Sequence, residues 1–236
     1  MINKMENQDT EFDLLADNYE QLLADPLRSR FAHSNDFFHQ RRFAILLSHL
    51  RAAGKSPSGL SWLDLGCGRG DLLRIGMTEF ASACGCDVSS ASLKYCQGIT
   101  VREQKRTDLI PFDFRSFDLV TAASVYHHVA ASGRLRLTQS VYDSLRPGGL
   151  FAIFEHNPWN PVTQLIVRRS PIDVNAILLY PSESIALLKE AGFVRISLHY
   201  FLLLPEIAGS RMSFLESWLS RIPLGGQYVV FGEMPG

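Results

Sequence analysis

The chain has 236 residues, of which 46% are hydrophobic and 20% are charged, and these proportions fit one globular α/β domain with a substantial core. The formal net charge of −1 gives no electrostatic reason to expect a nucleic-acid partner. No stretch has the uninterrupted apolar length of a membrane helix, and the first eleven residues hold no apolar secretory segment. We therefore expect a cytoplasmic protein without a membrane partner.

Two helices are predicted before the first core strand. Apolar residues recur at helical spacing between Phe12 and Leu23. Asn35 or Asp36 is placed to cap a second helix, which runs to about Leu50. A loop that contains serine, proline and glycine follows this helix.

The next stretch predicts a strand, a tight loop and a helix. An apolar run passes through Asp64, three glycines follow at alternate positions, and an apolar, helix-compatible segment comes next. Gly66, Gly68 and Gly70 lack the Cβ atoms that would keep a ligand away from the backbone, and the helix directs unpaired N–H groups into the same space. Dinucleotide-binding loops need G-x-G-x-x-G, but Asp71 stands where that third glycine would be, so the spacing argues against a nicotinamide cofactor.

A second strand, predicted at 80–86, ends beside Asp87, and Ser89 or Ser90 caps the helix after it. Asp87 lies about twenty residues beyond the glycine loop, where a carboxylate is placed to accept both ribose hydroxyl protons of an adenosine. The alternative is an aspartate that serves only the turn.

The remaining elements alternate between strands and helices, as is typical of a parallel sheet. The predicted elements, in chain order, are strands at 60–65, 80–86, 99–104, a fourth from about residue 116, 150–154, 193–201 and 227–231, and helices at 134–145 and 182–191. Ser182 is placed to cap the last helix and Gly192 to end it. The apolar segment 202–222 is either a helix over the substrate pocket or part of the core.

The four cysteines, Cys67, Cys84, Cys86 and Cys96, are expected to be free thiols that serve as small buried residues. Cys84 and Cys86 share one side of a strand, but no second pair or histidine cluster follows at ligand spacing. The sequence therefore predicts no metal site.

The segment from Asp64 to Gly70 resembles motif I of the class I S-adenosylmethionine (SAM) dependent methyltransferases, whose usual form is D/E-x-G-x-G-x-G. Three other stretches are similar to the small-molecule, type 11/12-like group of that family. They are F-D-x-x-A-x-x-Y at 12–19, the F-D strand that leads to two histidines at 116–129, and the turn L-R-P-G-G at 145–149. The run F-E-H-N-P-x-N-P-x-T at 154–163 resembles a bacterial subgroup associated with glycan or secondary metabolism.

The resemblance implies an α/β fold with a seven-stranded Rossmann-like methyltransferase sheet, mostly parallel with an antiparallel last strand, and helices on both faces. It implies one domain over residues 1–236, with a helical lid at 1–55 and substrate-side insertions at 156–181 and 202–224. S-adenosyl-L-methionine is the implied cofactor and a small molecule the implied methyl acceptor, while a homodimer stays open.

The same resemblance assigns residues to the cofactor. The candidate cofactor-binding residues are Tyr19, Asp64, Gly66, Cys67, Gly68, Gly70, Asp87, Val88, Thr107, Asp108 and Ala122. Tyr19 is a lid residue or, alternatively, a core contact of its own helix. Arg106 stands where the family commonly has an acidic residue before the adenine contact, so Asp108 is only a weak candidate for that contact.

The candidate catalytic residues, His127, His128, Glu155 and His156, follow strands at the edge where an open α/β sheet binds its ligands. A histidine there is either a general base or a packing residue against the cofactor. We expect His156 to be the base, with Glu155 orienting it or a substrate hydroxyl, in O- or C-methylation of a polar metabolite such as a sugar or a secondary-metabolite intermediate. The alternatives are a SAM-binding protein that has lost catalysis and, less favoured, an NAD-type oxidoreductase.

Overall fold

The computed structural model describes residues 12–208 and 219–236, which form a seven-stranded sheet in the order β3-β2-β1-β4-β5-β7-β6. The strands are β1 (Ser61–Leu65), β2 (Ser82–Asp87), β3 (Thr100–Glu103), β4 (Phe117–Ala123), β5 (Leu145–His156), β6 (Val194–Phe201) and β7 (Gln227–Glu233). The strands from β3 to β5 pair in parallel, whereas β7 runs antiparallel to both of its neighbours. The predicted fold class, a mostly parallel sheet with an antiparallel last strand, is confirmed.

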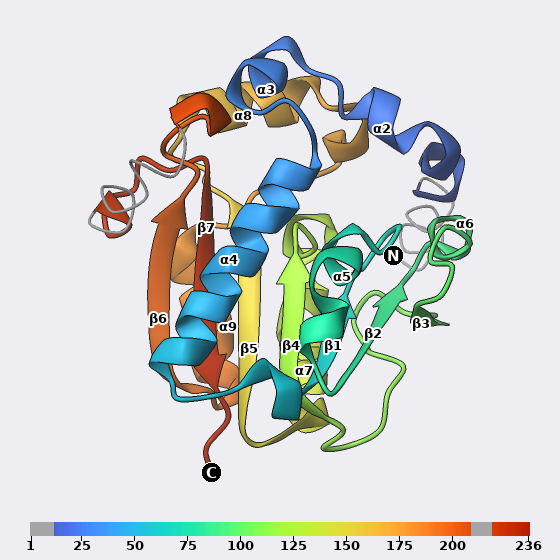
Figure 1. Cartoon of the computed structure of the whole chain (residues 1–236), viewed down its shortest axis with the longest axis vertical. Coiled ribbons are helices and arrows are strands. Elements are labelled where there is room, and N and C mark those ends of the chain that lie inside the picture. Colours follow the sequence, from blue (N-terminus) through green and yellow to red (C-terminus); the bar gives the residue numbers. More distant parts are fainter. Residues whose placement is uncertain (1–11, 209–218) are drawn as a thin grey trace.

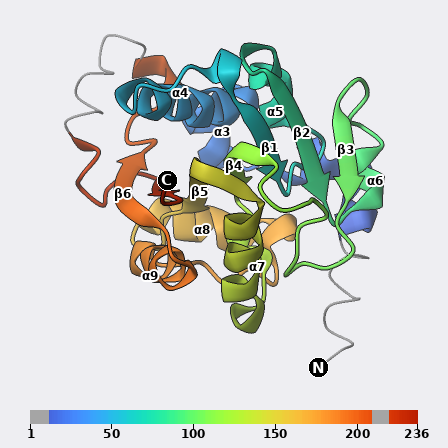
Figure 2. The same ribbon diagram turned by 90° about the horizontal axis from the view of Figure 1, so that it is seen from below.

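Helices cover both faces of the sheet (Figure 2). One face carries α4 (Asp36–Ala52) and α5 (Asp71–Gly76), and the other carries α7 (Ala131–Ser144) and α9 (Pro181–Ala191). Side chains of a strand point alternately to the two faces, so β5 contributes to both apolar layers. Phe151 and Ile153 belong to one buried cluster and Ala152 and Phe154 to the other.

Three short helices, α2 (Tyr19–Leu22), α3 (Pro26–Phe31) and α8 (Pro161–Arg169), lie beyond the carboxyl ends of the central strands, at the top of Figure 1. Neither α3 nor α8 was predicted, although each has a clear start signal, a capping side chain followed by proline. Asp25 accepts hydrogen bonds from the backbone N–H groups of residues 27 and 28, and Asn160 accepts one from Thr163.

The other described elements are α6 (Ser90–Leu93) and the 3-10 turns η1 (Ala16–Asn18), η2 (Pro57–Gly59), η3 (Met77–Glu79), η4 (Tyr126–His128), η5 (Pro171–Asp173) and η6 (Glu206–Ala208). The hydroxyl of Ser89 accepts a hydrogen bond from Ser92 N–H at the start of α6, so the first of the two predicted caps is the one used. Asn35 holds the cap position of α4, but its side chain makes no capping hydrogen bond.

Several predicted boundaries are wrong. Helix α7 begins at Ala131 and not at residue 134, and the helix predicted over 12–23 is interrupted by η1. The turn 145–149 lies within β5, where the pairing with β4 shifts register, and the strand continues through His156. Helix α9 begins at Pro181, one residue before its predicted cap Ser182, so Tyr180 is the N-cap residue. Proline suits the first helical position, and the side chain of Glu183 accepts the Tyr180 N–H at 2.8 Å. Gly192, with φ of +100°, ends this helix as expected.

All four cysteines are free. No helix within the described residues is long and apolar enough to cross a membrane. Residues 1–11 and 209–218, which include part of the predicted lid and about half of the apolar segment 202–222, lie outside the described residues.

Candidate active site

The site lies where the chain order of the sheet reverses. After β1 the chain moves outward through β2 and β3, and it returns to the other side of β1 with β4. In an open α/β sheet the ligand crevice lies at the carboxyl ends of the strands at this point. The glycine loop follows β1 directly, and the two adjacent histidines follow β4 in η4.

All three glycines of the loop have left-handed backbone conformations, with φ of +68° at Gly66, +53° at Gly68 and +81° at Gly70. A Cβ at Gly66 would lie 2.4 Å from a methyl group of Val125, and one at Gly70 would lie 2.8 Å from Ile99 Cδ1. A Cβ at Gly68 would meet no atom within 4 Å, because Gly68 borders a cavity. The space beside Gly68 is therefore open to a ligand.

Asp87, at the end of β2, ties this loop to the next strand. Its Oδ2 accepts the Gly68 N–H at 2.7 Å, and its Oδ1 accepts the Ser89 N–H at 2.8 Å. Burial raises the pKa of the Asp87 carboxyl, although these two backbone N–H groups partly oppose the effect. Each carboxylate oxygen keeps acceptor capacity, so the side chain suits a ligand that offers two hydroxyl groups.

Asp64 ends a buried hydrogen-bond chain behind the loop. Trp62 Nε1 donates to the Thr121 hydroxyl at 2.8 Å, and that hydroxyl donates to Asp64 Oδ1 at 2.6 Å. Burial raises the pKa of Asp64 to about 7, a shift that the Thr121 hydrogen bond opposes.

Most of the candidate site residues line one cavity. The candidates that do so are Tyr19, Asp64, Gly66, Cys67, Gly68, Asp87, Val88, Thr107, His127, His128 and His156. Gly70 instead packs against Cys96 and Ile99 behind the loop. Ala122 is fully buried in β4, and its neighbour Ala123 reaches the cavity.

Asp108 is also outside the cavity lining, since its carboxylate accepts two hydrogen bonds, at 2.9 and 2.8 Å, from the guanidinium of Arg106. Gln104, which was not among the candidates, lines the cavity near Thr107. Arg106 thus holds Asp108 outside the cavity, where it does not make the adenine contact for which it was a candidate.

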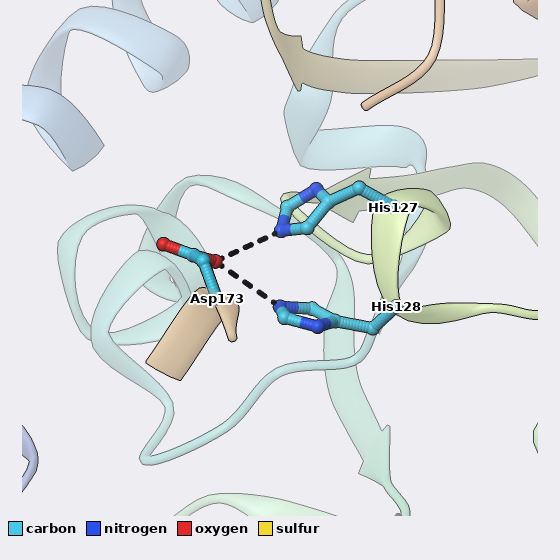
Figure 3. Close-up of side chains that lie close together, drawn as sticks. All are labelled: His127, His128 and Asp173. Carbon is cyan, nitrogen blue, oxygen red and sulfur yellow. Dashed lines mark ion pairs between the residues drawn. The ribbon is translucent and has the colours of Figure 1, made fainter. Parts of the chain in front are cut away.

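Three side chains converge at the far end of the cavity (Figure 3). One carboxylate oxygen of Asp173, from η5, lies 3.4 Å from Nε2 of His127 and 3.5 Å from Nε2 of His128. His127 is almost fully buried, and its Nε2 has no hydrogen-bond partner among the described residues. The ring of His156 lies beside that of His127, with 5.2 Å between the ring centroids.

Glu155 lies beneath this group and is completely buried. Its Oε2 is 2.5 Å from His127 Nδ1, and its Oε1 accepts the Tyr126 N–H at 2.8 Å. The expectation that Glu155 orients His156 is therefore corrected, because this carboxylate makes its hydrogen bonds with His127 and the backbone of η4. Glu155 reaches His127 because β5 continues through His156.

The electrostatics separate the three histidines. Burial lowers the pKa of His127, but the carboxylates of Glu155 and Asp173 outweigh it and raise that pKa to about 9. Burial, reinforced by the charge of His127, lowers the pKa of His128 to about 3 and that of His156 to about 4. Burial raises the pKa of Glu155, but His127 more than offsets this and brings it to about 2.

Several cavity residues were given no role from the sequence, because no local pattern shows that their side chains reach the site. They are Arg28, His39, Arg42, Gln104, Asp173 and Gln227. Arg42 donates to Gln227 Oε1 at 3.1 Å and to the Ser124 hydroxyl at 2.8 Å, and no carboxylate among the described residues pairs with it. A charged residue at a buried position of α4 is the signal that would have found it.

The comparisons with known proteins agree with this geometry. Residues 63–151 match the family model "Methyltransferase domain". A possible histamine N-methyltransferase from Thermotoga maritima is similar in structure, with a TM-score of 0.65, 17% identity, and coverage of 95% of this chain and 98% of its own. A SAM-dependent methyltransferase from Archaeoglobus fulgidus gives a TM-score of 0.62, 18% identity, and coverage of 80% and 93%.

A geranyl diphosphate C-methyltransferase from Streptomyces coelicolor, solved with S-adenosyl-L-homocysteine, gives a TM-score of 0.58 at 16% identity and covers 82% of this chain and 75% of its own. No protein of curated function matches the chain in sequence. At these identities the solved structures establish the fold, and the family model establishes the domain. Residues 63–151 therefore belong to a methyltransferase domain on the fold of SAM-dependent methyltransferases, and S-adenosyl-L-methionine is the cofactor that this domain indicates.

Proposed function

We propose that this methyltransferase methylates an oxygen or a carbon of a small polar metabolite, such as a sugar or a secondary-metabolite intermediate. The observation that carries the proposal is one cavity that joins the glycine loop to the three histidines. Arg28 and Arg42 also line it, and neither has a carboxylate partner among the described residues. Arg42 is buried and Arg28 is half-buried, and cations in a cavity wall without a carboxylate partner favour a ligand that brings polar or negative groups.

The cofactor is held at the glycine end. The open space beside Gly68 admits the ligand to the backbone, and Asp87 accepts the ribose hydroxyl protons with the oxygen lone pairs that its backbone donors leave free. Gln104 and Thr107 flank the adenine, since both line the cavity after β3. Tyr19 closes the cavity from the lid, where residues 12–42 contribute much of the wall.

The acceptor is held at the histidine end, where a side chain takes the proton that the acceptor loses on methylation. When bound, SAM supplies a methyl group on a sulfonium sulfur, whose S–C bond breaks with its electrons on sulfur while the bond to the acceptor forms. His156 accepts the proton that the acceptor atom loses. Glu155 fixes the orientation of His127, and the lid excludes water from the reacting atoms.

Methyl-labelled SAM, supplied with purified protein and a small-molecule extract of the source cells, tests the proposal directly. We expect mass spectrometry to find the label on a polar metabolite, which also fixes the acceptor atom. Binding of SAM without any transfer would favour the alternative of a SAM-binding protein without catalysis. Label on a protein or nucleic acid would contradict the substrate class.

His156→Ala tests the base. We expect turnover to fall by about 10²–10⁴-fold, the usual contribution of a general base, with SAM affinity within threefold of the parent protein. His49→Gln is the control, because His49 stacks on Phe231 outside the cavity. Survival of both SAM affinity and turnover in His156→Ala would rule out the assignment.

A further inference from the structure

We propose that His127, His128 and Asp173 form a binding site for a divalent transition-metal ion whose open coordination position faces the methyl acceptor. The proposal deepens the proposed function, on which it rests for the identity of the ligand at that position. It departs from the sequence expectation of no metal, because Asp173 lies far along the chain from the two histidines and its role emerges only from the fold.

The distances suit coordination better than hydrogen bonding. Asp173 Oδ1 lies 3.4 Å from one imidazole nitrogen and 3.5 Å from the other, whereas N–H···O hydrogen bonds in proteins span roughly 2.7–3.2 Å. A tetrahedral ion with bonds of 2.0–2.2 Å holds its ligand atoms roughly 3.3–3.6 Å apart. The three ligand atoms all lie within 4.8 Å of one another, the sole such group of histidine, cysteine and acidic side chains among the described residues.

A buried nitrogen that makes no hydrogen bond with any described residue, although it lies at ion-pair distance from Asp173, is the second, independent observation. Nε2 of His127 is aimed at the centre of the group, as Figure 3 shows, and has no hydrogen-bond partner among the described residues. A buried polar atom costs folding free energy unless something binds it. An ion between the three side chains would bind this nitrogen and account for the cost.

The surroundings have the form that supports a metal ligand. Metal-binding histidines typically donate their second N–H to a carboxylate, which fixes the tautomer and the ring orientation. Glu155 Oε2 lies 2.5 Å from His127 Nδ1 and keeps a proton on that nitrogen. An ion would displace the second proton, from Nε2, and bind the lone pair that then points toward Asp173. Glu155 is itself held by the Tyr126 N–H.

Backbone contacts bring Asp173 to the histidines. Ile177 N–H donates to the His127 carbonyl at 2.8 Å, and Arg134 donates to the Ile177 carbonyl at 2.9 Å. These two bonds hold the segment after η5 against η4. Phe12, from the lid, packs edge-on against the ring of His128 at 4.9 Å, which shields the group from solvent.

The donor set defines the class of ion and of acceptor. Two imidazoles and one carboxylate suit Zn²⁺, Fe²⁺, Mn²⁺ or Co²⁺, whereas Mg²⁺ and Ca²⁺ prefer all-oxygen sites. Three protein ligands leave a coordination position free, as in catalytic metal sites. Since all three residues line the cavity, that position takes an oxygen of the acceptor and favours a hydroxyl or phenol over carbon.

Metal binding is measured with Zn²⁺ and Co²⁺ as probes on the full chain after chelation. We expect one equivalent of Zn²⁺ per chain, and Co²⁺ visible absorption typical of imidazole ligation. Asp173→Asn and the milder His128→Gln should weaken Zn²⁺ binding at least 100-fold, and Glu155→Gln by about 10–100-fold. His49→Gln, outside the cavity, should keep the parental affinity.

SAM affinity, measured on the same variants, separates loss of the ion from loss of the fold, and we expect it to stay within threefold. The site would be overturned if the parent protein bound less than about 0.1 equivalents of metal per chain. Equal metal binding by the parent and Asp173→Asn would also overturn it. Methyl transfer that proceeds unchanged in chelator would refute the metal's role and leave the proposed function intact. If Zn²⁺ binding needs His128 and Asp173 but the protein transfers no methyl group, the metal site would stand and the proposed function would be contradicted.

Discussion

Gly68→Ala tests whether the glycine loop meets the cofactor, and Gly54→Ala provides a matched control. Both glycines have positive φ, +53° and +68°, and an added Cβ would meet no atom within 4 Å at either position. Gly54 follows α4 outside the cavity, whereas Gly68 lines it. The two substitutions therefore share a backbone cost and differ in what the new methyl group faces.

The magnitudes follow from these two properties. The left-handed conformation costs an alanine about 1–2 kcal/mol, offset by about 0.4–1 kcal/mol from the smaller entropy of the unfolded chain. Each variant should lose about 1 kcal/mol of unfolding free energy, or about 2–4 °C in Tm. Only Gly68→Ala should also lose SAM affinity, by about tenfold or more, because its methyl group occupies the cofactor's space.

Thermal unfolding with and without SAM distinguishes the variants. At a SAM concentration 100 times the parental Kd, the parent and Gly54→Ala should gain about 2.7 kcal/mol of stability. Gly68→Ala should gain only about 1.4 kcal/mol if its Kd rises tenfold. Equal gains for the two glycine variants would refute the placement of the cofactor beside Gly68.

Two further predictions concern buried charges in the cavity wall. The pKa of Asp64 in the folded protein, about 7, exceeds its ordinary value of 3.8, so the carboxyl stabilises the fold fully only below about pH 4 and loses that contribution as pH rises to 7. In SAM-free denaturant titrations, Asp64→Asn should be more stable than the parent at pH 8, by up to about 4 kcal/mol, and the difference should vanish toward pH 4. A difference that stays constant with pH would disprove the raised pKa of Asp64. Arg42→Met should weaken SAM binding or raise the acceptor KM at least tenfold. Because the guanidinium no longer has to be desolvated, the loss of its hydrogen bonds to Gln227 and Ser124 should be partly offset and the loss of stability modest. An unchanged SAM affinity together with an unchanged KM would show that no ligand group pairs with Arg42.

The cofactor half could be predicted from the sequence because its signals are local. The glycines, Asp87 and the Ser89 cap lie on consecutive strand, loop and helix segments, and each needs a particular residue type at its own position. A positive φ requires glycine, and a helix start favours a short hydroxyl side chain. Short-range rules of this kind do not depend on the rest of the fold.

The half of the site proposed for the acceptor could be predicted only in part. Its histidines follow strands and were found from the sequence, but tertiary packing adds side chains from distant segments. Asp173 reaches the histidines only because α8 and η5 fold back across the carboxyl ends of the strands. Arg42 looked like an ordinary helix residue, although its side chain is buried in the cavity wall. Asp108 was assigned by position, but Arg106, two residues earlier, forms a paired hydrogen bond with it and holds it outside the cavity.

We propose that the end of β5 and the insertion between β5 and α9, residues 155–180, determine which acceptor binds. Glu155 at the end of β5 supports His127, Asp173 in η5 faces it, and Ile177 binds its carbonyl, so one segment surrounds the histidines from three sides. The glycine loop makes none of these contacts. Substitutions in the insertion should therefore alter the acceptor or its orientation while SAM affinity persists, which is how the same sheet supports methylation of chemically different substrates.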